Sequence, residues 1–181
     1  MLRGDTYLHT AHRARGYFSE SRFFYLANQP PAPRSRAPRG FVRLEQAPPI
    51  MDVRGVDGFV VHYRGTYVTS PLKIPIQLKH GPESRSSYHQ TRCGMLIPVI
   101  GTRPDMTQGN VFERIRLLLD AHERTPRFYS PQKLYEIEHN RPTNAERAVM
   151  ELIEQSRNAF SYAPDKDIDR IIETLGVPPQ V

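Results

Sequence analysis

The chain has one cysteine, Cys93, so no disulfide can form within it. A zinc site built from several cysteine thiolates is excluded for the same reason. A single thiol fits a reducing compartment, and we therefore expect a cytoplasmic location. No apolar run approaches the roughly 20 residues that a membrane-spanning helix needs, so we expect no membrane partner.

Common nucleotide-binding fingerprints are missing as well. The chain has neither a phosphate-cradling Walker loop nor the glycine-rich motif of dinucleotide-binding folds, and it shows no internal repeat. Apolar residues make up 38% and charged residues 24% of the chain, which is typical of a soluble globular protein. Its 181 residues allow one domain with a substantial core and a small appendage.

Positive charge is concentrated at the N-terminal end. The net charge is +6, and residues 1–43 carry all of it, since they hold eight arginines against two acidic residues. Such an excess suits a polyanion such as a nucleic-acid backbone. Two other interpretations stay open, an organelle transit peptide and a solvated basic surface.

The pattern of apolar residues predicts a helix, then strands, then more helices. Residues 11–27 are expected to form a helix, and the prolines and arginines of residues 29–39 predict an exposed loop that lies along a phosphate backbone or merely connects two elements. Strands are predicted over 41–46, 56–63, 72–79 and 95–100, with a short helix over 83–93. Pro75 predicts an edge position or a bulge for the third strand.

The last third of the sequence favours helices. Thr107 is a predicted N-cap for a helix over residues 109–123. Thr143 and Glu146 form a capping-box pattern, and another helix is predicted over 167–175. We therefore expect a core over residues 1–125 with the loop 29–39, and a helical extension over residues 126–181.

Asp57 and the segment Gln77-Leu78-Lys79 carry the chemistry that the sequence suggests. Two apolar runs that hold these residues predict neighbouring strands of a hairpin. Side chains alternate along a strand, so Gln77 and Lys79 should point the same way, and pairing could bring Asp57 to the same end. A carboxylate, an amide oxygen and an amine would then converge, which suits a divalent metal and a water that attacks phosphate.

An aspartate followed by a strand that ends in Gln-x-Lys resembles the core of the PD-(D/E)XK nuclease superfamily. The glutamine form is similar to the branch that includes Mrr-type restriction enzymes. Glu20, in the predicted first helix, resembles the acidic residue that the family often carries there. The matching order of elements covers residues 10–102.

The resemblance implies an α/β fold with a restriction-endonuclease-like mixed central sheet flanked by helices. It also implies Mg²⁺-dependent hydrolysis of DNA, with Mn²⁺ as a substitute. Asp57 would be the central metal ligand, joined by the Gln77 amide oxygen and the Leu78 backbone carbonyl. Glu20 would bind the metal directly or through water. Lys79 would position the attacking water or stabilise charge on the phosphate.

DNA is the expected partner, with RNA left open, and a homodimer or a larger complex is also expected. Asp52, five positions before Asp57, is a rival acid for which we expect local turn chemistry. Further residues are candidates for contacts with nucleic acid: Arg13, Arg15, Arg34, Arg36, Arg39, Arg54, His80 and Arg85.

Two alternatives to the nuclease stay open. Gln77 removes one negative charge compared with glutamate, which favours a binding module that keeps the nuclease fold without its chemistry. The amphipathic C-terminal helices favour a protein-interaction subunit of a larger nucleoprotein complex.

Overall fold

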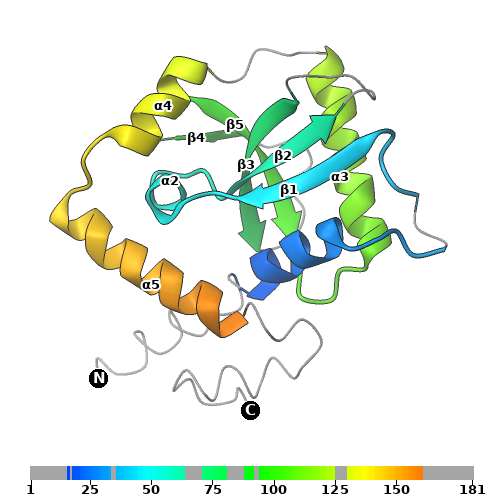
Figure 1. Cartoon of the computed structure of the whole chain (residues 1–181), viewed down its shortest axis with the longest axis horizontal. Helices are drawn as coiled ribbons and strands as arrows, with labels where there is room; N and C mark the ends of the chain where they lie inside the picture. Colours follow the sequence, from blue (N-terminus) through cyan, green and yellow to red (C-terminus); the bar gives the residue numbers. More distant parts are fainter. Residues whose placement is uncertain are drawn as a thin grey trace.

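The structure, a computed structural model, describes residues 16, 18–33, 36–63, 71–80, 88–91, 94–124 and 130–160; for residues 88–90, 159 and 160 it describes only the backbone. These ranges form a five-stranded mixed sheet with helices on both faces (Figure 1). The mixed sheet, the flanking helices and the helices C-terminal to the sheet confirm the predicted fold class. Among the helices described, none has the length and apolarity to cross a membrane.

The strands are β1 (Phe41–Gln46), β2 (Gly58–Tyr63), β3 (Leu72–His80), β4 (Tyr88–Gln90) and β5 (Leu96–Thr102). Their order in the sheet is β1-β2-β3-β5-β4. β2 runs antiparallel to β1 and β3, β3 runs parallel to β5, and β4 runs antiparallel to β5. The four predicted strands therefore correspond to β1, β2, β3 and β5.

The predicted helix over residues 83–93 is wrong where the structure describes it, since Tyr88–Gln90 is a strand paired with β5. Backbone hydrogen bonds link the described residues between the two strands. The Thr91 carbonyl accepts from the Gly94 N–H at 2.9 Å, and Gly94 has a φ of 74°, which glycine adopts without steric cost. A hairpin therefore supplies the sheet edge next to β5.

Pro75 lies in a central strand, so the predicted edge position is wrong. Pro75 faces Phe59 of β2, whereas pairing of β3 with β5 begins only at Gln77. The neighbouring residue Ile76 directs its carbonyl to the β2 side, where it accepts from the Asp57 N–H. The ring nitrogen of Pro75 therefore faces the β5 side, at a position where β3 is not yet paired with β5. Because no hydrogen bond is needed there, the missing N–H of proline costs the sheet nothing.

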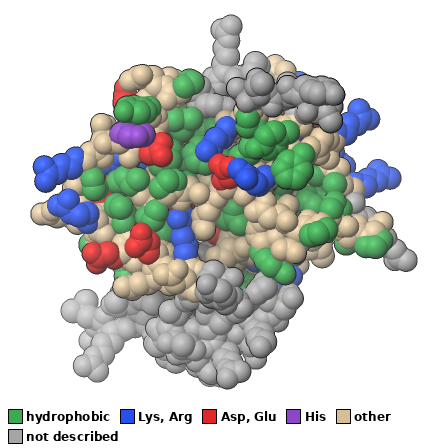
Figure 2. Space-filling model, in the orientation of Figure 1, with side chains coloured by type: hydrophobic (Ala, Val, Ile, Leu, Met, Phe, Trp, Pro, Cys, Tyr) green, Lys and Arg blue, Asp and Glu red, His purple; other side chains and the backbone are tan. Residues whose placement is uncertain are grey.

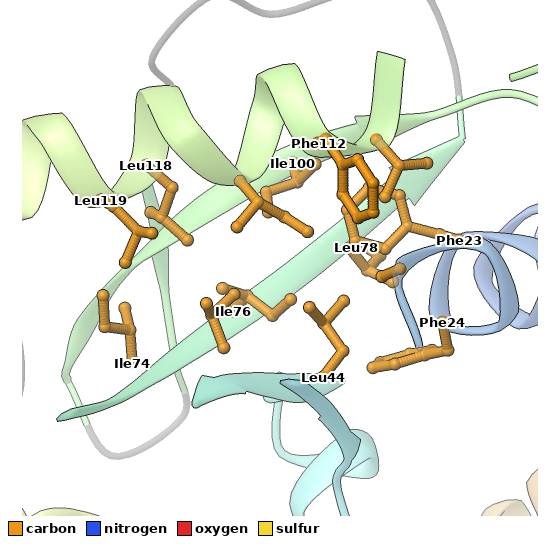
Figure 3. Close-up of a cluster of buried hydrophobic side chains, with 14 of the residues drawn as sticks. Phe23, Phe24, Leu44, Ile74, Ile76, Leu78, Ile100, Phe112, Leu118 and Leu119 are labelled. Carbon is orange, nitrogen blue, oxygen red and sulfur yellow. The ribbon is translucent and has the colours of Figure 1, made fainter. Parts of the chain in front are cut away.

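One face of the sheet packs against the N-terminal helix, which the structure describes over residues 18–28, and against α3 (Gln108–Arg124). Alternate residues of β3, Ile74, Ile76 and Leu78, point into this core, which also contains Phe23 and Phe112 (Figure 3). Burying each of these side chains stabilises the fold by about 1.5–3 kcal/mol. The helices predicted over 11–27 and 109–123 are confirmed over the residues described.

The opposite face packs against two helices that the sequence did not reveal, α2 (Pro49–Val53) and α4 (Pro131–His139). Phe59 and Val61 of β2 meet Met51 of α2 and Ile137 of α4 in a second core. Figure 1 places α2, α4 and α5 (Asn144–Phe160) together on this side. The sheet is therefore covered on both faces.

The capping box that begins α5 is confirmed. The Thr143 N–H donates to Glu146 Oε2 at 2.8 Å, and the Glu146 N–H donates to Thr143 Oγ1 at 3.2 Å. Thr107 caps α3 similarly, since its Oγ1 accepts from the Asn110 N–H at 3.3 Å. The helix predicted over 167–175 lies outside the described residues.

Arg54 ties α5 and α4 to the segment after α2. Its Nε donates to Glu146 Oε1 at 3.0 Å, and its Nη1 donates to the Ile137 carbonyl at 2.6 Å. Both ion-pair side chains are buried, at 8% and 9% exposed. The prediction that Arg54 contacts nucleic acid is wrong, because its guanidinium is enclosed and already bonded. The predicted extension is anchored to the core through this pair.

Replacing Arg54 with methionine should lower the free energy of unfolding by about 3–5 kcal/mol, because Glu146 would remain buried without its cationic partner. Urea denaturation near neutral pH measures the loss. The Arg54 hydrogen bond lowers the pKa of Glu146 from 4.5 to about 2, so this stabilisation is present above 4.5 and disappears as the pH falls towards 2.

The matched control is Arg147→Met, which removes an exposed arginine from the same helix and should change stability by less than about 0.5 kcal/mol. Equal, small effects of the two substitutions would show that the buried pair does not hold α5 in place.

Candidate functional site

Asp57 lies where β2 begins and β3 approaches its end. Its side chain is buried, at 3% exposed. Asp57 Oδ2 accepts from Gln77 Nε2 at 2.7 Å and from the backbone N–H of Leu78. The juxtaposition of Asp57 with the end of β3 that the sequence suggested is therefore present in the structure.

Backbone bonds on both sides hold Asp57 in this position. Its N–H donates to the Ile76 carbonyl at 2.9 Å, and its carbonyl accepts from the Ala47 N–H at 3.0 Å. Ile76 is also the register partner of Gly58, so two consecutive residues face one residue of β3, as in a β-bulge. Such a bulge re-aims a side chain, here the Asp57 carboxylate towards Leu78.

Gly58 brings the N-terminal helix against the same point. A Cβ at this residue would overlap the Phe24 ring and lie 2.7 Å from the Glu45 carbonyl oxygen. Only glycine allows this close approach of helix and strand. Because Glu20 lies one turn before Phe24 on that helix, the contact also sets the position of Glu20 relative to Asp57.

The end of β3 provides two further oxygen atoms. Gln77 Oε1 is buried and has no hydrogen-bond partner among the described residues. The Leu78 N–H points to the β2 side, and in an extended strand the carbonyl of the same residue points that way too. Both oxygens are therefore candidates for a ligand beside Asp57.

Lys79 and His80 lie on opposite faces of the sheet, as alternation requires. Lys79 shares the face of Gln77 and is exposed. His80 faces the N-terminal helix, where its Nδ1 lies 3.1 Å from Ser19 Oγ. The structure thus keeps Lys79, and not His80, on the side of the Gln77 amide.

An ion pair that the sequence did not reveal adjoins the site. Arg157 of α5 donates from Nη2 to Asp52 Oδ2 at 2.8 Å and from Nη1 to the Ala47 carbonyl at 2.7 Å. The expectation of local turn chemistry for Asp52 is wrong, because its partner is 105 residues away. Arg157 lies one turn after the buried Ile153, on the same side of the helix. An arginine in line with the buried face of a helix was the signal in the sequence that could have indicated a buried ion pair.

Burial dominates the electrostatics of the three acids. It raises the pKa of Asp57, and repulsion from Asp52 raises it further, while the Leu78 N–H, Arg157 and Gln77 oppose the rise. Burial and the charges of Asp57 and Asp52 raise the pKa of Glu20, which Arg157 again lowers. Burial raises the pKa of Asp52 to about 6 against the lowering effect of Arg157. The site is thus short of positive charge.

This donor set fits a hard divalent cation in its chemistry. The described residues include no group of three or more His, Cys, Asp or Glu side chains spaced to hold a metal. Mg²⁺, however, needs only one or two carboxylates together with other oxygens. Asp57 supplies a carboxylate, Gln77 supplies a buried oxygen that no described residue contacts by a hydrogen bond, and Glu20 supplies a second acid within electrostatic range.

The basic residues proposed for nucleic-acid contacts are only partly described. Arg36 and Arg39, in the last part of the loop 29–39, are exposed. On the face shown in Figure 2, the Lys and Arg side chains of the described residues are scattered and do not form one patch. Four candidates lie outside the described residues: Arg13, Arg15, Arg34 and Arg85.

Comparison with protein-family models, with curated proteins and with solved structures found no match.

The metal-free protein should lose stability as the pH rises, because the folded state favours protonated Asp52. This contribution is fully present below the ordinary pKa of 3.8 and is lost as the pH rises through about 6. It amounts to at most about 3 kcal/mol. Urea denaturation in the presence of a chelator, at several pH values across this window, measures it.

Asp52→Asn is the test variant, and its stability relative to the wild type should increase as the pH rises through the window. Asp52→Asn also removes the charge that raises the pKa of Glu20 and Asp57, and this effect has the same sign, so the difference reports Asp52 together with its influence on those two acids. A difference that does not change with pH would contradict the assignment.

Proposed function

We propose that this protein is a metal-dependent nuclease that hydrolyses phosphodiester bonds in DNA, with Mg²⁺ as cofactor and Mn²⁺ as a substitute. The observation that carries the proposal is the convergence of Asp57, Gln77 and Leu78 where β3 ends. It agrees with the order of residues in which the sequence resembles PD-(D/E)XK nucleases. A second copy for double-strand cutting stays a prediction.

Asp57 and Gln77 would hold the metal, with the Leu78 carbonyl as a further ligand and Glu20 binding directly or through water. When bound, the metal would lower the pKa of a coordinated water and offset negative charge on the phosphate. The bulge at Asp57 and Gly58 fixes the carboxylate, so the ligands are placed before any cation arrives. Two buried hydrophobic cores pack against the two faces of the sheet that carries these residues.

Lys79 would act on the phosphate from the exposed end of the strand. Its ammonium group offers three donors on the face of Gln77, where it can orient the attacking water or stabilise the added negative charge. In the reaction, the water oxygen loses one proton and bonds to phosphorus, the bond from phosphorus to the leaving oxygen breaks, and the leaving oxygen gains one proton.

A second function is favoured by the bonds that Asp57 already makes. Two N–H donors satisfy Asp57 Oδ2 without any cation, so this end of the sheet is held together in the metal-free protein. That arrangement suits a nucleic-acid-binding module with the nuclease fold but no cleavage. Such a module would bind DNA or RNA with an affinity that falls steeply as the salt concentration rises.

A plasmid-nicking assay with Mg²⁺ and then Mn²⁺ tests the nuclease. The wild type should nick or linearise the plasmid only with metal, and Lys79→Ala should lower the rate by roughly 10²- to 10³-fold, because a donor to the transition state is lost. Lys73→Ala is the matched control: Lys73 is exposed on the same strand and face, towards the opposite end, where it pairs with Glu45.

Metal-dependent cleavage with equal rates in Lys79→Ala and Lys73→Ala would refute the role of Lys79. No cleavage by the wild type, together with salt-sensitive gel shifts, would support the binding module in place of the nuclease.

Gln77→Glu should make the stability of the fold depend more strongly on a bound cation. The variant loses the amide donor to Asp57 and places a second carboxylate beside it, so the metal-free protein should lose about 1–3 kcal/mol. Mn²⁺ should then raise the melting temperature more than it does in the wild type, because binding is coupled to folding. Differential scanning fluorimetry with and without Mn²⁺ measures both effects.

Gln132→Glu, an exposed change on α4, is the control for the added charge. A response to Mn²⁺ in Gln77→Glu that equals the wild-type response would argue against Gln77 as a ligand.

A further inference from the structure

The Asp52–Arg157 ion pair is built into the site and is not a surface contact. The two side chains are only 13% and 16% exposed. Arg157 comes from α5, far along the chain, whereas Asp52 lies on α2, five residues before Asp57. The C-terminal helices therefore contribute a side chain next to the proposed metal ligands.

A continuous set of hydrogen bonds joins this pair to Asp57. Arg157 Nη1 donates to the Ala47 carbonyl at 2.7 Å, and the Ala47 N–H donates to the Asp57 carbonyl at 3.0 Å. The pair also links α2 to α5, because Asp52 lies on α2. The Met51 carbonyl of α2 in turn accepts from the N–H of Val56, the residue before Asp57, at 2.9 Å. The bonds of Arg157 thus bear on the backbone that positions Asp57.

The balance of charge explains why a guanidinium is needed there. Glu20, Asp52 and Asp57 act on one another electrostatically, and Arg157 is the cation that acts on all three. With every group ionised, three carboxylates and one guanidinium leave two negative charges. One divalent cation would neutralise these two charges. Without Arg157 the three carboxylates would still carry one negative charge after a divalent cation had bound.

We propose that Arg157 is a positioning residue of the metal site, which holds Asp52 in an ion pair so that the carboxylates offer a divalent cation a single binding position. This inference rests on the proposed metal-dependent function. Arg157 occupies the place beside Asp52 that a second cation would otherwise take. It makes the C-terminal helix α5 part of the site.

The test is a double-substitution cycle read by Mn²⁺ binding, measured by isothermal titration calorimetry above the pKa of Asp52. The wild type should bind one equivalent of Mn²⁺. Arg157→Met should tighten binding of the first Mn²⁺ by about three- to tenfold, because it leaves an unpaired carboxylate near the ligands. Asp52→Asn should weaken binding by a similar factor, since it leaves an unpaired guanidinium there.

The double variant Asp52→Asn with Arg157→Met removes both charges and should bind within about twofold of the wild type. Arg147→Met, on the same helix but exposed and next to Asn144, should bind as the wild type does. If Arg157→Met does not fold, Asp52→Asn and the double variant still test whether the charge of Arg157 opposes Mn²⁺ binding. The double variant should recover the affinity that Asp52→Asn loses.

Unchanged or weaker Mn²⁺ binding by a folded Arg157→Met protein would overturn the inference, since a purely structural tether gives that result. Two equivalents bound by the wild type would overturn it as well. Failure of the wild type to bind Mn²⁺ at all is a distinct outcome, which would remove the proposed metal-dependent function itself.

Discussion

The hydrogen bonds to the Asp57 carboxylate are the interaction on which this end of the molecule depends. A buried carboxylate is costly unless donors satisfy it, and here a side-chain amide and a backbone N–H of β3 do so. The same bonds fix how β2 enters the sheet, because Asp57 and Gly58 face one residue of β3. Because Gly58 has no side chain, the N-terminal helix reaches this point and places Glu20 there. The bulge and the end of β3 are thus tied to satisfying one carboxylate, and the glycine of the bulge admits the first helix.

Electrostatics imposes a second constraint, which links distant parts of the chain. Asp52 lies close enough to Asp57 and Glu20 to raise the pKa of both, and burial raises the pKa of all three acids. Arg157 offsets part of this cost from the far end of α5. At its beginning, α5 is held by the buried pair of Glu146 with Arg54. Two ion pairs, one near each end of the helix, therefore secure α5 against the α2 segment that leads to Asp57.

The predictable parts of this protein are those set by local rules. Alternation along 72–79 placed Gln77 and Lys79 on one face, and the capping pattern at Thr143 marked the start of α5, because both effects act within a few residues. Arg54 and Asp52 were misassigned because their partners lie 92 and 105 residues away, where sequence spacing carries no information. Tyr88–Gln90 forms a strand only because β5 is beside it, so tertiary pairing decided against the predicted helix.

Glutamine at position 77 has a use that an acid could not serve. Its Nε2 donates to Asp57 while its buried Oε1 has no partner in the part of the chain that the structure describes, so one side chain both satisfies the carboxylate and presents an acceptor. A glutamate there would repel Asp57 until a cation arrived, and the metal-free site would carry a further negative charge that Arg157 alone could not offset. The amide therefore lets the end of the sheet fold without metal. It still leaves an oxygen for a cation, but a neutral amide oxygen attracts a cation less strongly than a carboxylate does. We expect such a site to be preformed and to bind its metal more weakly than a site with two carboxylates at these positions.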